Sequence, residues 1–551
     1  MKAIHATPKE VRKIFNDSYV IPDFQRPYSW EREQCETLWD DIVSFHSIAP
    51  PNEQYFLGNI VIVKPDGSEK WSVVDGQQRL TTLLLLIKSF FKSAGTYTAL
   101  GKCLRVLDKR TGEFTDELRV KSEVLTDDAA KLHKIIFDTI GDNDSSKLAE
   151  NFRYFVETIE EWRKATSNSA DALLNLIDTF LDKIVLLPIE CGDDDDALTI
   201  FQTINNRGMS LTDADIFKAK LYHSVPESER GTFIENWKRL GTPENAERLF
   251  RVLMHIIRAE NNITDKEIGL RTFFTANKSK RLVDWRGIMA SLKKINAADD
   301  AWSGTPDNFG AIDSLWAILK TYPNLYWNYP IYVFLHKYGE LTPNDEFSLA
   351  AKYCNELEHL LIETVKYYFI KGVVHNAVNT VKDTSFKVCA AIAAGKDYKA
   401  EFDANITASD KMKIATLLED GNIGARYLRG FVILASFLNP RQDKAAFSEM
   451  LWKHCDIEHI LPKEWNHYDG WTQETYEAHI NLLGNLMPLE RAKNIKAQNE
   501  YLRKKKALYK YSAVQDALEM LSVPDNGWTP QAVEDKHLEK VLRLNAFFGL
   551  E

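Results

Sequence analysis

Residues 70–95, KWSVVDGQQRLTTLLLLIKSFFKSAG, decide how the N-terminal part of the chain folds. The β-branched and aromatic run up to Asp75 predicts a strand, and the apolar spacing after Gly76 predicts a buried helix that ends near Gly95. The first turn of a helix presents unpaired N–H groups, which form a natural seat for phosphate. On its own, the stretch favours the plainer interpretation of a strand and a helix joined by an aspartate-capped turn, because it is not a P-loop.

Side chains in this stretch nonetheless suit a nucleotide. Arg79 can fork onto phosphate oxygens, and the hydroxyl groups of Thr81 and Thr82 add donors. Asp75 can hold Mg²⁺ through water or orient an attacking water.

The composition is that of a soluble globular protein. The chain has 551 residues, 44% apolar and 27% charged, so three domains are expected. Its N-terminal sequence is too polar for a signal peptide, and its longest apolar run, LTTLLLLI, is too short to span a membrane. Six scattered cysteines without a C-x-x-C pair predict reduced thiols, a cytoplasmic setting and no cysteine-rich zinc site. A net charge of −10 argues against a wholly basic nucleic-acid coat.

The pattern along the chain predicts a multidomain α+β protein. Residues 1–225 mix strands, such as YFLGNIVIV at 55–63, with helices, whereas residues 226–425 are almost entirely helical. Residues 426–551 combine helices with the strand-like CDIEHIL. In the helical middle, Trp302, Trp316 and Trp327 are interpreted as buried core rather than as a base-stacking surface.

Two further segments change the interpretation of the DGQQR turn. IPDFQRPYSWEREQCETLWDDI, residues 21–42, carries Gln25, Arg26, Tyr28 and Trp30 around two prolines. FQTINNRGMSLTDADIFKAKL, residues 201–221, places asparagines and Arg207 in a loop before a capped helix. Singly, each is an ordinary turn.

Together and in this order, the three segments resemble the N-terminal domain of the GmrSD family over roughly residues 10–225. The resemblance implies a ParB/sulfiredoxin-like core that binds and hydrolyses a nucleoside triphosphate. The resemblance does not specify the nucleobase of this triphosphate, although GTP is favoured. The nucleotide-binding residues it implies are Gln25, Arg26, Asp75, Gly76, Gln77, Gln78, Arg79, Thr81, Asn205 and Arg207, with Asp75 also catalytic.

DIEHILPKEWN, residues 456–466, contains the residue types of a metal-dependent nuclease. A histidine such as His459 can activate water, because its pKa falls near neutral. An acid and an amide oxygen can hold Mg²⁺ or Mn²⁺. Downstream, HINLLGNLMPLERAKNIKAQN supplies Asn481, Asn485 and Asn494. A polar turn with a core histidine is the competing interpretation.

His-x-x-Pro followed by LLGNLMPLERAKN is similar to the GmrSD C-terminal domain, an HNH-type nuclease of the ββα-metal fold, over roughly 430–510. The resemblance implies His459 as general base, Glu458 and Asn494 as metal ligands and Asn485 as an orienting amide. Neighbouring residues on a strand point to opposite faces, so Asp456 is kept as an alternative ligand to Glu458.

A basic segment follows these motifs. Between Leu486 and Ser512, eight basic residues stand against two acids, which suits the phosphate backbone of DNA. A solvated helix face is the competing interpretation. The residues expected to contact DNA are Lys493, Lys496, Arg503, Lys504 and Lys505.

We therefore expect a nucleotide-binding domain over residues 1–225, a helical connecting domain over 226–425 and a nuclease domain over 426–551. One chain with both activities resembles single-polypeptide GmrSD enzymes, type IV restriction systems that cut modified phage DNA. The expected partners are double-stranded DNA and a nucleoside triphosphate, with no membrane, and a homo-oligomer is left open. The rival interpretations are an NTP-gated DNA clamp with an inactive nuclease domain, and a toxin-like nuclease without a modification requirement.

Overall fold

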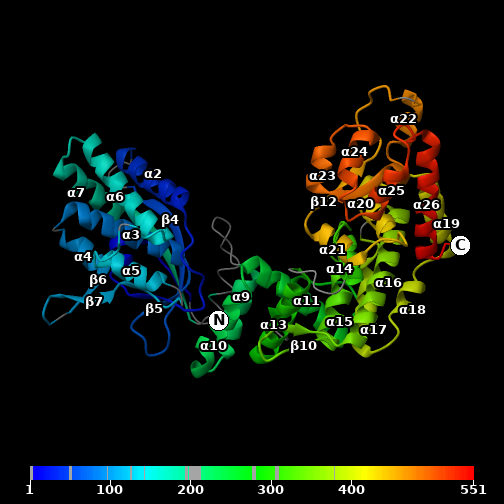
Figure 1. Cartoon of the computed structure of the whole chain (residues 1–551). Helices are drawn as coiled ribbons and strands as arrows, with labels where there is room; N and C mark the ends of the chain where they lie inside the picture. Colours follow the sequence, from blue (N-terminus) through cyan, green and yellow to red (C-terminus); the bar gives the residue numbers. More distant parts are fainter. Residues whose placement is uncertain are drawn as a thin grey trace. The chain divides into compact units, whose positions relative to one another are not determined.

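The computed structural model describes residues 4–48, 53–95, 97–108, 110–124, 127–141, 143–192, 197, 212–275, 281–303, 310–377, 379–468 and 470–550. The chain divides into two compact units (Figure 1). Unit 1 comprises residues 1–244 with 282–285, and unit 2 comprises 245–281 with 286–551. The division into three functional domains, with boundaries near 225 and 425, stays a prediction.

Unit 1 is built on a mixed sheet in the order β1-β9-β4-β5-β3-β8, with β2 also paired to β9. Strand β4 runs parallel to β9 and antiparallel to β5, whereas β3 runs parallel to both β5 and β8. A separate strand pair joins β6 to β7. The strands are β1 His5–Ala6, β2 Lys9–Glu10, β3 Tyr19–Ile21, β4 Tyr55–Val63, β5 Trp71–Asp75, β6 Arg105–Leu107, β7 Phe114–Leu118, β8 Val120–Ser122 and β9 Ile184–Cys191.

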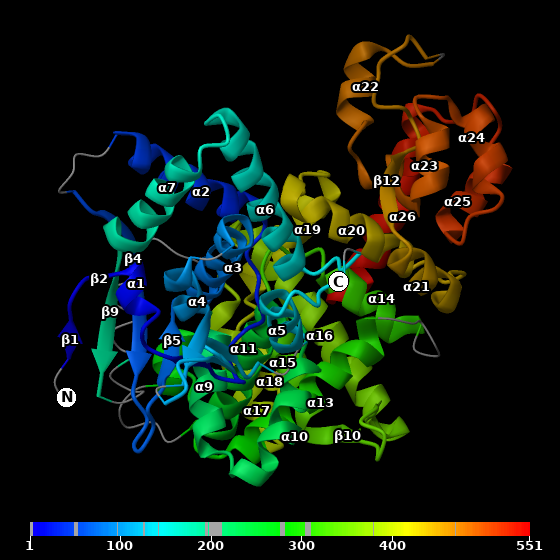
Figure 2. The same ribbon diagram turned by 90° about the vertical axis from the view of Figure 1, so that its left-hand side faces the viewer.

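Helix α3 is the central buried helix of unit 1, because its residues from Leu80 to Phe90 are all buried. Helix α3 contacts α4, α5, α6 and α7 (Figure 2). Its predicted course and its end at Gly95 are confirmed, as is strand 55–63. The helices are α1 Val11–Ile14, α2 Arg32–Ile48, α3 Gln77–Ala94, α4 Thr98–Leu104, α5 Asp128–Ile136, α6 Lys147–Ala165, α7 Ala170–Lys183, α9 Asp213–Ser224 and α10 Arg230–Lys238.

Unit 2 is mainly helical. Its two short strand pairs are β10 Glu340–Leu341 with β11 Phe347–Ser348, and β12 Cys455–His459 with β13 Leu486–Glu490. Trp316 and Trp327 are buried as predicted, whereas the side chain of Trp302 lies outside the described residues. The helices are α11 Pro243–Glu260, which begins in unit 1, α12 Leu270–Thr275, α13 Trp285–Ser303, α14 Gly310–Leu319, α15 Asn328–Tyr338, α16 Ala351–His375, α17 Lys382–Ala394, α18 Lys399–Asp403, α19 Ala408–Glu419, α20 Ala425–Phe437, α21 Lys444–Trp452, α22 Gln473–His479, α23 Arg491–Ala497, α24 Leu502–Tyr509, α25 Gln515–Glu519 and α26 Pro530–Phe548.

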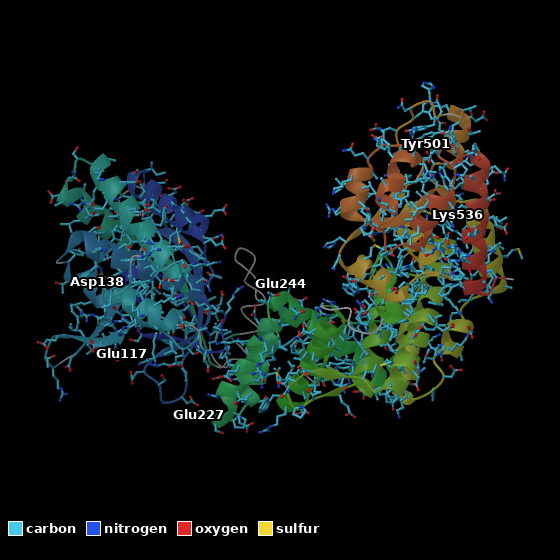
Figure 3. The ribbon with its side chains drawn as sticks, viewed as in Figure 1. Glu117, Asp138, Glu227, Glu244, Tyr501 and Lys536 are labelled. Carbon is cyan, nitrogen blue, oxygen red and sulfur yellow. The ribbon has the colours of Figure 1, made fainter. Side chains whose placement is uncertain are left out.

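A buried acid, Asp516 on α25, ties several of these elements together. It lies 3.2 Å from the ammonium of Lys540 and 3.1 Å from the guanidinium of Arg543, both on α26, and accepts a hydrogen bond from Ser436 on α20. Lys536, labelled in Figure 3, adds a third cation at 3.7 Å. Burial would raise the pKa of Asp516, but the three positive charges hold it well below its usual range. The cluster therefore fastens α20, α25 and α26 to one another.

Candidate functional sites

The QRPYSW segment, residues 25–30, is fastened onto the end of β5 and the start of α3. The buried side chain of Gln25 donates to the carbonyl of Val74 at 3.1 Å. Gln78 accepts from the N–H of Ser29 at 2.8 Å and donates to the carbonyl of Pro27 at 3.0 Å. Two of the three predicted motifs therefore meet in space. Both glutamines act here as supports for the loop.

Tyr28 anchors the same segment from the other side. Its hydroxyl lies 2.8 Å from that of Thr82 and accepts from Asn151 at 3.1 Å, while its N–H donates to Asp128 at 2.8 Å. Burial raises the pKa of Tyr28 well above its usual range. The hydroxyl is thus engaged inside unit 1.

Gly76 makes the turn between β5 and α3 possible. Its φ of +90° is in the left-handed region, and a Cβ at this position would lie 2.6 Å from a methyl carbon of Ile60. Helix α3 begins there without a side-chain cap. Its first N–H groups are consequently left for another partner.

A partly open pocket lies beside this helix start, and its space of about 290 Å³ includes open solvent. Four of the predicted residues line it, namely Arg26, Gln77, Gln78 and Thr81. The sequence analysis missed the rest of the lining, which comes mostly from β8, α5, α6 and the segments beside them. These missed residues are Ile21, Ser122, Val124, Asp128, Leu132 and Leu148, together with Tyr28, which had not been assigned to the site.

Asp75 and Arg79 are not among the lining residues. The guanidinium of Arg79 packs against Gly58 of β4 and donates to the carbonyl of Asn59 at 2.6 Å. Burial lowers the pKa of Arg79. Burial also raises the pKa of Asp75, against the N–H of Gly76 and the charges of Arg79 and Arg26, which lower it. Arg79 therefore reaches the sheet, in contrast to its predicted place on phosphate.

The third motif, with Asn205 and Arg207, lies outside the described residues.

In unit 2, the strand predicted at CDIEHIL is β12 (Figure 1). It pairs antiparallel with β13. The pairing matches Cys455 with Glu490 and His459 with Leu486. Helix α23 follows β13 directly and contacts both strands. This arrangement places His459 at the last position of β12, where the strand passes into the His-Ile-Leu-Pro segment.

The backbone after His459 is held by side chains from two other segments. The amide of Asn485, which is wholly buried, accepts from the N–H of Leu461 at 2.7 Å and donates to its carbonyl at 3.3 Å. Tyr476 donates to the carbonyl of Pro462 at 2.9 Å. The segment is thus held by hydrogen bonds from side chains distant in the sequence. Because the side chain of Asn485 is not exposed, it can act only on its neighbours, and it holds the backbone of this segment by hydrogen bonds.

His459 itself is half-buried, with Nε2 3.3 Å from Oδ1 of Asn481. An amide oxygen only accepts, so with this amide orientation Nε2 carries the proton and Nδ1 is the basic nitrogen. Burial lowers the pKa of His459 to about 4, helped by the charges of Lys463 and Lys505 and opposed by the hydrogen bond with Asn481. The imidazole is therefore neutral near pH 7, as a general base has to be, but its pKa lies below the near-neutral value expected from the sequence.

The two candidate acids of β12 differ in their surroundings. They are two positions apart and so share a strand face, which means that strand alternation does not separate them. Glu458 is 4% exposed, and its Oε1 accepts from Tyr509 at 2.7 Å and lies 2.7 Å from the ammonium of Lys505. The side chain of Asp456 is 40% exposed, with Arg491 4.0 Å away. Asp456 is thus the more accessible carboxylate.

The donors here fit Mg²⁺ or Mn²⁺ in kind. Among the described residues, no three His, Cys, Asp or Glu side chains gather as a metal site. A cation would therefore be held by one or both carboxylates of β12, an amide oxygen and water, a set that Mg²⁺ accepts. Asn494 is the predicted amide, on the helix that packs against both strands.

The predicted DNA contacts divide into exposed and buried residues. Arg503 and Lys504 are 81% and 71% exposed, Lys496 is exposed, and Lys493 forms an ion pair with Glu490 at 2.7 Å. Lys505 contradicts the prediction, because it is 1% exposed and turned towards Glu458. Its ammonium is not available to a phosphate.

Comparison with known proteins identifies the chain. Residues 11–222 match the N-terminal domain of a restriction endonuclease family, and residues 408–539 match the C-terminal domain of the same family. The protein is thus a restriction endonuclease, a class whose substrate is DNA. It belongs to the GmrSD restriction endonucleases and carries both domains on one polypeptide. No curated protein matches it. In the part of the chain that the structure describes, no helix is long and apolar enough to cross a membrane.

Proposed function

We propose that unit 2 cuts DNA as a metal-dependent HNH nuclease, with β12, β13 and α23 as its ββα-metal core. The observation that carries this proposal is the rigid presentation of a neutral His459 at the end of β12, beside the carboxylates of Asp456 and Glu458. Hydrogen bonds fix the backbone on the C-terminal side of the histidine. A general base has to be held in place in this way.

In the reaction, Nδ1 of His459 takes a proton from a water molecule. The water oxygen then attacks phosphorus, the bond from phosphorus to one sugar oxygen breaks, and that oxygen takes a proton from solvent water. Asp456, Glu458 and Asn494 would hold Mg²⁺ or Mn²⁺, which would stabilise the charge on the leaving oxygen. The exposed Lys496, with the other exposed basic residues of α23 and α24, would contact the DNA backbone.

For unit 1, we propose a ParB/sulfiredoxin-like core that binds and hydrolyses a nucleoside triphosphate, with GTP favoured. The pocket beside the uncapped start of α3 supports this, because helix N-terminal N–H groups and Arg26 are suited to phosphate. We place the phosphate groups in the pocket, next to the first N–H groups of α3 and Arg26, and the nucleoside at its open side.

We propose further that the substrate is modified phage DNA and that the nucleotide state of unit 1 controls cutting by unit 2. A nuclease that shares a compartment with host DNA has to be restrained. A bound nucleotide can bias a protein between two states.

The experiment is a cleavage assay on plain and modified DNA, with Mg²⁺ or Mn²⁺ and with or without each nucleoside triphosphate. His459→Ala should lose cutting and keep NTP hydrolysis. Arg26→Ala should lose nucleotide binding, whereas Arg32→Ala should not, because Arg32 is exposed on α2 and paired with Glu36.

Each outcome has a distinct meaning. Cutting of modified DNA alone supports the restriction function and names the modification. Equal cutting of plain DNA would favour a toxin-like nuclease. Hydrolysis of NTP with DNA binding but without any cutting would favour an NTP-gated clamp.

A further inference from the structure

Lys505 is the one predicted DNA contact that points into unit 2. Its ammonium lies 2.7 Å from Oε1 of Glu458 and donates to the main-chain carbonyl of His459 at 2.6 Å. A third contact, to the carbonyl of Ile460, measures 3.4 Å. An ammonium has three N–H donors, and each has an acceptor here. All three acceptors belong to consecutive residues at the end of β12.

This arrangement links an acid to a base. Without its ammonium, Glu458 would be a nearly unexposed carboxylate with only the hydroxyl of Tyr509 beside it. Burying such a charge is costly unless it is paired and hydrogen-bonded. The same ammonium fixes the carbonyl of His459, and with it the direction in which β12 ends. One side chain therefore sets the position of two neighbouring groups.

We propose that Lys505 is a positioning residue of the nuclease site, an inference that rests on the proposed nuclease function. Its ammonium pairs with the carboxylate of Glu458 and donates to the backbone carbonyl of His459, so that the imidazole and the carboxylates keep their mutual geometry. Tyr509, one helical turn further along α24, supplies the second hydrogen bond to Glu458. Helix α24 thus has two roles, with exposed basic residues on one face and the positioning residues Lys505 and Tyr509 on the other.

Lys504 is a matched comparison for Lys505. It is the preceding residue of the same helix, is largely exposed, and pairs with Glu500 at 2.7 Å. If lysines of α24 acted only by attracting DNA, both substitutions to methionine would weaken binding. If Lys505 positions the site, its loss lowers turnover of bound DNA and leaves affinity intact.

The experiment measures kcat and DNA affinity at one fixed salt concentration for Lys505→Met, Lys504→Met and Tyr509→Phe, with His459→Ala beside them. Thermal unfolding reports whether each variant is folded. We expect Lys505→Met to lower kcat by about ten- to a hundredfold, the usual effect of losing a group that orients metal or catalytic residues. Its DNA affinity should stay within about twofold of the wild type. Lys504→Met should weaken binding and keep kcat.

Unchanged kcat in Lys505→Met, or a loss confined to DNA affinity, would overturn the inference. If Lys505→Met does not fold, Tyr509→Phe decides, because it removes one hydroxyl and keeps the buried ion pair. Lower kcat in Tyr509→Phe supports positioning from α24, and unchanged kcat refutes it. Full cutting by His459→Ala would instead refute the placement of the nuclease site at His459, and no cutting by the wild type would refute the nuclease function.

Discussion

Replacing Asn485 with alanine tests how the nuclease segment is held. The amide oxygen of Asn485 accepts from the N–H of Leu461 at 2.7 Å and from the indole N–H of Trp528 at 3.1 Å. Its NH₂ donates to the carbonyl of Ile480 at 2.9 Å. In Asn485→Ala, the two N–H donors lose their acceptor in a place where Asn485 has no exposure.

The expected loss of stability can be worked from these contacts. A buried donor left without a partner costs about 1–3 kcal/mol. Two such donors give a loss of about 2–6 kcal/mol in the free energy of unfolding, against a total of about 5–15 kcal/mol for a typical domain. The same change loosens the segment that follows His459, so cutting should fall as well.

The free energy of unfolding is measured by urea titration monitored by tryptophan fluorescence, and cutting is measured in the cleavage assay. Asn481→Ala is the control, because Asn481 is exposed and contacts His459 at 3.3 Å. It should change the free energy of unfolding by no more than about 0.5 kcal/mol and still reduce cutting, since the imidazole loses its hydrogen bond. If Asn485→Ala unfolded at the wild-type urea concentration but did not cut, Asn485 would act on the substrate and our reasoning would be wrong.

Three further predictions concern other parts of the chain. Gly76→Ala should lower the free energy of unfolding by about 2 kcal/mol or more, since it places a Cβ against Ile60 at positive φ. It should also abolish nucleotide binding measured by calorimetry. The same change at Gly141, which has open space around it, should affect neither stability nor binding. Burial raises the pKa of Asp313 to about 6, so the folded state binds this proton more tightly than the unfolded chain and stability is lost as pH rises from about 4 to about 6. Asp313→Asn should therefore raise the melting temperature at pH 8 and not at pH 4, and an equal effect at both pH values would contradict this. Chelation by EDTA should stop cutting, Mn²⁺ should restore it, and circular dichroism should not change, because side-chain hydrogen bonds hold the site.

The parts of the fold that could be predicted were those with a local signal. Strand 55–63 and helix α3 follow from their residue patterns and from the glycine between β5 and α3. Strand β9, which lies between β1 and β4, was not predicted. Its sequence IVLLPIEC is an apolar run with a proline, and a strand that is buried along most of its length has no alternation to reveal it.

The sites divide in the same way. His459 and Gly76 belong to motifs that are continuous in sequence, so they could be named. Asp128 enters the pocket from a segment far along the chain, and no pattern could have placed it. Lys505 is different, because the buried residues of α24 are Leu502, Lys505 and Tyr509. Their spacing of three and four is that of one helix face, and it could have separated Lys505 from its basic neighbours.

The Asp516 cluster extends beyond the segment that matches the C-terminal domain of the family. The recognisable C-terminal module ends at residue 539, inside α26. Lys540, the next residue, donates to the carbonyl of Leu486 on β13 at 2.6 Å and pairs with Asp516. A fragment trimmed to the module would keep every motif letter and lose Lys540 and Arg543, two of the three cations that fasten its last helix. Expression boundaries for this protein should therefore follow the buried charges and include all of α26.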